Sequence, residues 1–307
     1  MYRKFFYMIM LCSIVMPGLL AAENRGDAFS ENTAEAAGNK KDSSWVTSTT
    51  LGLKLTQVSF TNWATGGDNA LAFEASAIYQ ADYKKNKHIW QNRIELAYGL
   101  NKSGSDGLKK TNDKIYLNSN YGYEITKNLY LSALLNFQTQ FSNGYDYAVS
   151  NSVPISKFMA PGYLTIGPGI TWIPKPYFKL IFSPATWRGT FVLNDSLSNA
   201  GSFGVDPGKK VLNEFGANLK LEVKYEFLKN MTVYSRVDFY SDYLRKPLNI
   251  DVNWEVQLNM QINKWFSATF TTNLIYDDDI KITQPDGSNG PRVQFKELLA
   301  VGFQYTF

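Results

Sequence analysis

The sequence predicts a transmembrane antiparallel up-and-down β-barrel of about twelve strands, and residues 248–263 provide the first reason. Apolar side chains occupy every even position of this segment, and Asn, Asp, Glu or Gln occupies every odd one. Because alternate residues of a strand point to opposite faces, the segment is a strand with one apolar and one polar face. It is longer than the ~5–6 residues usual in soluble sheets, whereas ~9–11 tilted residues per strand cross a bilayer. Similar segments recur along the chain, and their connections alternate between short and long.

The composition agrees with a chain in which apolar and polar residues are interleaved. Aromatic residues make up 15% of the sequence, yet the mean hydropathy is −0.26. Tyr and Trp suit a membrane surface, because one end of each side chain is apolar and the other is polar. The first partner that the sequence predicts is therefore a lipid bilayer.

The N-terminus has the pattern of a secretory signal peptide. Arg3 and Lys4 precede an apolar stretch over residues 5–20, and Ala22 suits the last residue of the cleaved segment. Cys12 lies within the apolar stretch, so the mature chain has no cysteine. Cleavage leaves 29 basic against 27 acidic side chains, a balance that does not favour nucleic acid as a partner.

We expect three regions: a signal peptide over 1–22, a disordered periplasmic leader over 23–44 and a barrel over 45–307. The leader is polar, with Phe29 its only large apolar residue, and such a composition cannot bury a core. The strands predicted from alternation cover residues 47–60, 69–82, 88–100, 113–124, 128–141, 161–173, 177–192, 211–227, 231–243, 248–263, 265–276 and 292–307.

The twelve segments differ in regularity. Each of the first five places Leu, Ile, Phe, Tyr or Ala side chains on one face. Glycines and prolines, among them Gly167 and Pro184, interrupt the sixth and seventh, and such residues mark bends or bulges. The last five alternate again, most clearly over 211–227 and 248–263.

The connections and the C-terminus predict where the barrel resides. Connections after even-numbered strands are short, such as Asn263-Lys264, and most of those after odd-numbered strands are longer. Outer-membrane barrels have short periplasmic turns and longer outside loops. The last residue is Phe307, with Tyr305 and Phe303 on the same face. This ending resembles the terminal strand that the bacterial outer-membrane insertion machinery recognises, so we expect that machinery as a partner and the bacterial outer membrane as the location.

Several short motifs, in their order along the chain, resemble a family of Bacteroidetes outer-membrane proteins catalogued as a domain of unknown function. The resemblance implies a barrel-like fold and an outer-membrane location, and it implies no activity. The motifs are Asn62-Trp63, Gly66-Gly67-Asp68-Asn69, Lys110-Thr111-Asn112-Asp113, Thr139-Gln140-Phe141, Phe158-Met159-Ala160-Pro161-Gly162-Tyr163, Ser183-Pro184, Phe203-Gly204-Val205, Tyr276-Asp277-Asp278-Asp279 and Gln294-Phe295-Lys296-Glu297.

No catalytic residue or cofactor is predicted. His88 is the one histidine, and it lies at the end of a predicted short turn, away from the outside rim. A Ser–His or Asp–His hydrolase is therefore disfavoured. Asp277, Asp278 and Asp279 could offer oxygen ligands to a divalent cation. Their spacing is not that of a known calcium loop, so these three residues are weak candidates for a metal site.

The inward faces of the strands are the remaining candidates for function. They carry charges of both signs, which fits a narrow channel for small polar solutes, and equally fits side chains that pair across the lumen and fill it. The alternative function is a non-conducting scaffold or a barrel that binds a partner protein or glycan through the loop aromatics Tyr145, Tyr147, Trp187 and Phe203. The predicted lumen-lining residues are Arg93, Glu95, Lys220, Glu222, Arg236, Asp238, Asp251, Glu255, Arg292 and Lys296.

Overall fold

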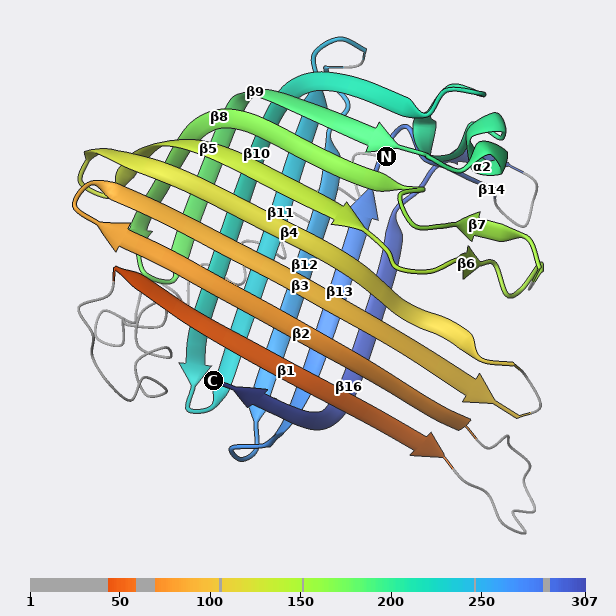
Figure 1. The fold of residues 1–307 in the computed structure, drawn as a ribbon, viewed down its shortest axis with the longest axis horizontal. Helices are drawn as coiled ribbons and strands as arrows, with labels where there is room; N and C mark the ends of the chain where they lie inside the picture. The colour runs from red at the N-terminus through yellow and green to blue at the C-terminus, as the bar shows by residue number, and fades with distance from the viewer. Residues whose placement is uncertain (1–43, 59–69, 105–106, 151, 246, 284–287) are drawn as a thin grey trace.

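The chain forms a closed barrel of twelve antiparallel strands, each hydrogen-bonded to its neighbours in sequence order (Figure 1). The computed structural model describes residues 44–58, 70–104, 107–150, 152–245, 247–283 and 288–307. In this part of the chain no helix has the length and apolar character needed to cross a membrane. The predicted signal peptide, nearly all of the leader and the motifs at 62–69 lie outside the described residues.

The barrel strands have eleven to eighteen residues. The closing pair is β1 with β16, so first and last strands meet. The strands are β1 (Trp45–Val58), β2 (Ala70–Lys85), β3 (His88–Ser103), β4 (Lys109–Thr126), β5 (Leu129–Thr139), β8 (Gly162–Lys175), β9 (Phe178–Phe191), β10 (Val211–Leu228), β11 (Met231–Asp242), β12 (Asp251–Gln261), β13 (Phe266–Tyr276) and β16 (Gln294–Thr306).

The predicted fold class and all twelve strands are confirmed. The boundaries differ most at β4, which begins four residues earlier and ends two residues later than predicted, and at β12. This strand begins at Asp251, not at residue 248. Leu248 lies in the preceding turn and is 94% exposed. Pro247, which has no N–H to donate to a neighbouring strand, precedes it. At the other end Asn263 leaves the strand, and its Oδ1 accepts from the backbone N–H groups of Trp265 and Phe266, each at 2.9 Å.

Two of the short turns share one arrangement. Asn128 and Asn230 adopt φ of 65°, a left-handed conformation that Asn tolerates better than most residues. Each follows a strand whose register shifts near its end, as in three-residue hairpin loops. Glu124 and Glu226 complete the turns, because their Oε1 atoms accept from the backbone N–H of Asn128 (3.2 Å) and Asn230 (2.8 Å). We call this end of the barrel, where β1 begins and β16 ends, the short-turn end.

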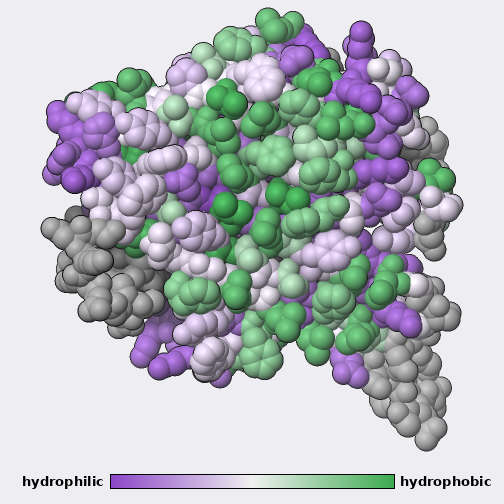
Figure 2. All heavy atoms as spheres, viewed as in Figure 1, coloured by the Kyte–Doolittle hydropathy of each residue, from purple (hydrophilic) through white to green (hydrophobic). Residues whose placement is uncertain are grey.

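The outer wall is apolar. Leu53, Leu131 and Phe303 are more than half exposed, although they lie within strands. Figure 2 shows hydrophobic side chains gathered over the middle of the wall, with hydrophilic ones toward both ends. Exposed apolar area of this kind marks contact with a partner or a membrane.

The opposite end, the long-loop end, carries additional small elements. They are the pairs β6 (Gly144–Tyr145) with β7 (Pro154–Ser156) and β14 (Lys281–Thr283) with β15 (Asn289–Pro291), the helix α2 (Asp195–Asn199) and the 3₁₀ turn η1 (Ser202–Gly204).

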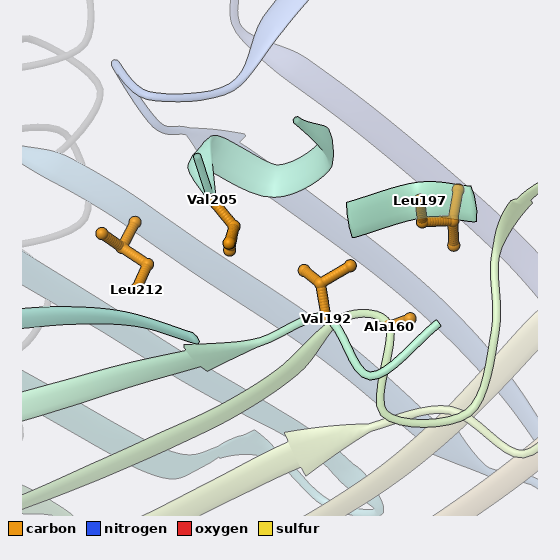
Figure 3. Packing of buried hydrophobic residues seen from close by; sticks show 5 residues of the cluster. All are labelled: Ala160, Val192, Leu197, Val205 and Leu212. Atoms are coloured by element: carbon orange, nitrogen blue, oxygen red, sulfur yellow. The ribbon is translucent and has the colours of Figure 1, made fainter. Parts of the chain in front are cut away.

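Helix α2 is capped at its N-terminus by Asn194 and packs on a small apolar cluster. The Asn194 side chain accepts from the N–H of Leu197 at 3.2 Å, which satisfies one of the free donors of the first turn. Ala160, Val192, Leu197, Val205 and Leu212 form the buried cluster, drawn together in Figure 3. The long connection after β9 is therefore an ordered part of this end.

We expect Leu258→Arg to lower the free energy of unfolding by about 2–4 kcal/mol, because this residue lies on the apolar outer face of β12. Gln257→Arg is the matched control, since Gln257 lines a polar cavity inside the barrel. Chemical unfolding from lipid vesicles measures the difference. Equal stability of the two variants would show that the faces of β12 are assigned incorrectly.

Candidate functional site

The site that the structure brings together is a cluster of charged side chains in the middle of the lumen. Glu95 on β3 lies 2.5 Å from both Arg93 Nε and Lys114 Nζ. Glu255 on β12 lies 3.2 Å from Lys114 Nζ and 3.1 Å from Arg236 Nη2. Arg236 Nη1 is also 3.6 Å from Glu95. We call these five residues the central ion cluster.

The central ion cluster spans the full width of the barrel. In the order of strands around the ring, β4 and β12 stand six places apart in either direction, and so do β3 and β11. The Lys114–Glu255 and Arg236–Glu95 pairs therefore join opposite walls. Glu95 and Arg236 are each only 6% exposed.

Two tyrosine rings pack against this cluster. The guanidinium carbon of Arg236 lies 4.3 Å from the ring centre of Tyr116, and that of Arg93 lies 5.4 Å from the ring centre of Tyr234. Both separations allow attraction between the cation and the face of the ring. The rings add apolar volume to a level of the lumen that is already crossed by ion pairs.

Two further ion pairs continue along the same inner wall. Lys179 Nζ lies 2.6 Å from Glu222, and Lys220 Nζ lies 3.3 Å from Asp238. Lys220 is 2% exposed, which is rare for lysine unless it is paired. These pairs join β9, β10 and β11, which are neighbours in the sheet.

A separate cluster lies toward the long-loop end. Arg188 donates to both oxygens of Glu214 at 2.8 and 2.6 Å and to Asp251 at 2.6 Å. Its guanidinium carbon is 3.9 Å from the ring centre of Tyr240. A bidentate pair of this kind fixes geometry as well as charge. The cluster connects β9 with β12, three places away in the ring.

The structure therefore places eight of the ten predicted lumen residues in ion pairs: Arg93, Glu95, Lys220, Glu222, Arg236, Asp238, Asp251 and Glu255.

Of the other two predicted lumen residues, Lys296 on β16 also faces the lumen. It is exposed to solvent, and its Nζ donates at 3.1 Å to Asn112 Oδ1 on β4, four places away in the ring. Arg292 is a correction, because it lies between β15 and β16, outside the barrel strands, and is exposed. The alternating pattern was extended beyond the start of β16 to include Arg292.

Sequence reasoning missed Lys114, Lys179, Arg188 and Glu214. Lys114 and Glu214 lie on the polar faces of predicted strands, so alternation alone could have found them. Arg188 was harder to find, because the pairing of β8 with β9 is irregular between Ile166 and Ile170 and shifts the faces.

The loop residues Asp277, Asp278 and Asp279 take part in local hydrogen bonds. Asp277 Oδ1 accepts from the Asp279 N–H at 2.9 Å, and Asp278 Oδ2 accepts from Asn249 Nδ2 at 2.7 Å. Over the described residues, no group of three or more His, Cys, Asp or Glu side chains is arranged to hold a metal ion. The carboxylates order this loop against the start of β12, where Asp251 Oδ1 accepts from the Asp278 N–H at 3.3 Å.

His88 and the loop aromatics have structural contacts. His88 Nδ1 lies 2.6 Å from the Tyr121 hydroxyl, and its ring meets Tyr123 edge-on at 5.1 Å. This group lies at the short-turn end, where β3 begins. Tyr147 accepts from the Lys110 N–H at 2.7 Å. Trp187, grouped above with the loop aromatics although it falls within the predicted strand 177–192, lies within β9.

A polar cavity of about 390 Å³ fills the lumen between the central ion cluster and the short-turn end. Its wall is formed by residues from β1, β2, β3, β10, β11, β12 and β16, together with Asn230 of the adjoining turn. Arg93 and Tyr234 close its inner side and also line a smaller adjacent space of about 40 Å³.

Comparison with known proteins adds a family match over part of the chain. A family model described as "Protein of unknown function (DUF3078)" matches residues 55–145, less than a third of the sequence. This match agrees with the resemblance to a domain of unknown function. No curated protein matches the chain.

Solved structures with a similar arrangement are membrane barrels of low identity. An outer membrane channel from Pseudomonas putida F1 is 10% identical, with a TM-score of 0.39, over 85% of this chain and 94% of that one. The NanC porin is 9% identical, with a TM-score of 0.37, over 83% and 98%. The translocator domain of the autotransporter NalP from Neisseria meningitidis is 10% identical, with a TM-score of 0.31, over 90% and 93%. Values this low carry no information on activity.

We expect Glu255→Gln to lower the free energy of unfolding by roughly 2–4 kcal/mol, because Arg236 and Lys114 lose a shared carboxylate while Glu95 still partly neutralises both. Asp195→Asn is the control, since it removes a pair with Lys210 at the exposed surface, where ion pairs contribute little. Urea unfolding of both variants makes the comparison. A Glu255→Gln barrel as stable as the control would mean that the cluster does not hold the walls together.

The Asp277 carboxyl predicts a pH dependence at the long-loop end. Burial and the nearby Asp251 raise the pKa of Asp277 to about 6, against an opposing effect of Arg188. The folded barrel therefore holds this proton more tightly than the unfolded chain, and the associated stability is lost as the pH rises from about 4 to above 6. We expect Asp277→Asn to raise the free energy of unfolding by roughly 1–3 kcal/mol at pH 8 and to leave it nearly unchanged at pH 4. The same gain at both pH values would contradict the assignment.

Proposed function

We propose that the chain is a bacterial outer-membrane β-barrel whose lumen is closed across its middle, so that it does not conduct small solutes in the form described. The outer wall supports the membrane location, because its strands expose apolar side chains where a soluble sheet would place polar ones. Each strand is also long enough to span a bilayer when tilted.

The observation that carries the proposal is that ion pairs join opposite walls of the lumen. In an open channel, charged side chains on opposite walls are separated by water. Here Lys114 and Glu255 meet at 3.2 Å, and Arg236 reaches Glu95 at 3.6 Å. Solutes would have to displace both pairs to pass.

The energetics favour a closed lumen as the resting form. Removing one partner of a buried ion pair costs about 3–5 kcal/mol, because the other charge is left buried and uncompensated. The cluster contains two carboxylates and three cations that share partners, so the two pairs that cross the lumen must separate together before the lumen opens. Thermal fluctuation opens such an arrangement only rarely.

A second candidate function is a channel for small polar solutes that opens when the central ion cluster rearranges. The polar cavity at the short-turn end favours this candidate, because it already forms the part of a solute path between that end and the central ion cluster. The two candidates differ in whether the closed form is permanent.

The test is conductance of the purified, folded barrel in planar bilayers. We expect the unmodified chain to be electrically silent. A variant with Lys114, Glu255, Glu95 and Arg236 all changed to Ala should show discrete current steps, because it removes both crossing pairs without changing the net charge. Asp195→Ala with Lys210→Ala is the matched control, since it removes a pair from the surface of the long-loop end. Folding is checked by the different migration of boiled and unboiled samples on SDS gels.

Steady open conductance of the unmodified barrel would overturn the closed-lumen proposal. Current steps in the unmodified barrel only after a solute is added would favour the second candidate.

A further inference from the structure

The polar cavity at the short-turn end has the size of a binding site for one small molecule. Its volume of about 390 Å³ falls within the ~300–1,000 Å³ of ligand pockets in proteins. It is closed on one side by Arg93 and Tyr234, at the level of the central ion cluster. The cavity is therefore a chamber that is closed at its inner end, and it is not part of a continuous channel.

The lining is made almost wholly of groups that form hydrogen bonds. Six side-chain amides and five aliphatic hydroxyls line the cavity, and Ile78 is its one aliphatic side chain. Most ligand pockets are instead predominantly apolar, with a few polar groups. An occupant must therefore carry many hydroxyls or amides of its own, because it has to replace the hydrogen bonds that water makes with this wall.

Several of these amides have spare hydrogen-bonding capacity. In the described part of the chain, the side chains of Gln80 and Gln257 make no hydrogen bond to other protein groups. They lie on β2 and β12, which are separated around the ring by β1, β16 and β13. A ligand in the chamber would meet donors and acceptors from more than one side.

The charge of the chamber favours an anion. Its lining has three cations, Lys54, Arg93 and Lys224, and one carboxylate, Glu226. Lys54 is paired with Glu74 at 3.1 Å, and Arg93 with Glu95 at 2.5 Å. The Glu226 carboxylate accepts from the Asn230 N–H at the turn.

Lys224 is the cation left over. Over the residues that the structure describes, Lys224 Nζ has no carboxylate within 4.0 Å. Asp82 and Glu222 line the smaller adjacent space together with Lys224, and Glu222 is paired with Lys179 at 2.6 Å. Asp82 attracts Lys224 electrostatically without contacting it. An ammonium group that no carboxylate contacts can accept the carboxylate of a ligand.

We infer that this chamber binds a small polyhydroxylated monocarboxylate, of the class of uronic or aldonic acids. Lys224 holds the carboxylate, and amide and hydroxyl groups such as Gln80, Gln257 and Thr232 hold the ligand hydroxyls. The inference rests on the proposed function only for the compartment from which the ligand enters, because the chamber is a property of the folded barrel itself.

Isothermal titration calorimetry on the detergent-folded full chain tests the site, with D-glucuronate as the probe and D-glucose as the neutral comparison. We expect saturable binding of glucuronate and weaker binding of glucose. Lys224→Gln should weaken glucuronate binding by at least about tenfold, the loss expected for one hydrogen bond to a charged group, and leave glucose binding unchanged. Lys229→Gln is the matched control, because this lysine lies in the exposed turn after β10.

A second variant keeps the test decisive if Lys224→Gln does not fold. Thr232→Tyr places a large side chain in the chamber without removing a charge, and it should abolish binding of both sugars. No saturable binding of glucuronate to the unmodified barrel would overturn the inference, and so would equal affinities in the unmodified and Lys224→Gln proteins. A barrel that binds glucuronate but conducts freely refutes the closed lumen alone, and one that is silent but binds nothing refutes the chamber alone.

Discussion

Closure of the sheet between β1 and β16 is the constraint on which the rest of the structure depends. In a hydrocarbon environment every backbone N–H and C=O must find a partner within the protein, so an open sheet edge is not tolerated. Five residue pairs form this closing seam, whereas β1 and β2 share fourteen. Reciprocal backbone bonds between Thr49 and Phe307, at 2.8 and 2.9 Å, extend it to the last residue. Gly302 lies within the seam, where a Cβ would overlap the carbonyl oxygen of Leu53.

Closure also decides what the two faces must contain. The outer face can be apolar throughout, because nothing on it needs a hydrogen-bond partner. The inner face is confined to a lumen of fixed width, and charges placed there must be neutralised by one another. The central ion cluster neutralises charges in the middle of the lumen, and Arg188 with its carboxylate partners does so nearer the long-loop end. In the polar chamber, neutral amides and hydroxyls make up most of the lining.

The sequence was sufficient to predict the wall but not the contents of the lumen. Period-two alternation in segments such as 211–227 determines a strand and its two faces, and these features are local. The partner of Lys114 is not local, because it depends on how far the sheet curves before it closes. Ion pairs between adjacent strands, such as Lys179 with Glu222, follow from register once the strands are known. Those between opposite strands follow only from strand number, tilt and closure together.

The loops also contain some features that the sequence predicts and others that depend on the folded barrel. The Asn residues of the short turns mark their positions in the sequence, because a left-handed residue is needed there. Helix α2 has only five residues and depends on the apolar cluster beneath it. Helices this short are not stable on their own, so propensity could not reveal it.

The opposite-wall ion pairs have a consequence for the order in which the barrel assembles. Lys114 and Glu255 are 141 residues apart in sequence, and β4 and β12 reach opposite positions only when the intervening strands have joined the sheet. Contacts of such long separation form late in folding, because the loop between them must first be ordered. Until then the charged side chains remain hydrated in a widening sheet. Water is therefore expelled from the middle of the lumen in one of the last steps, after the lipid-facing wall is largely built.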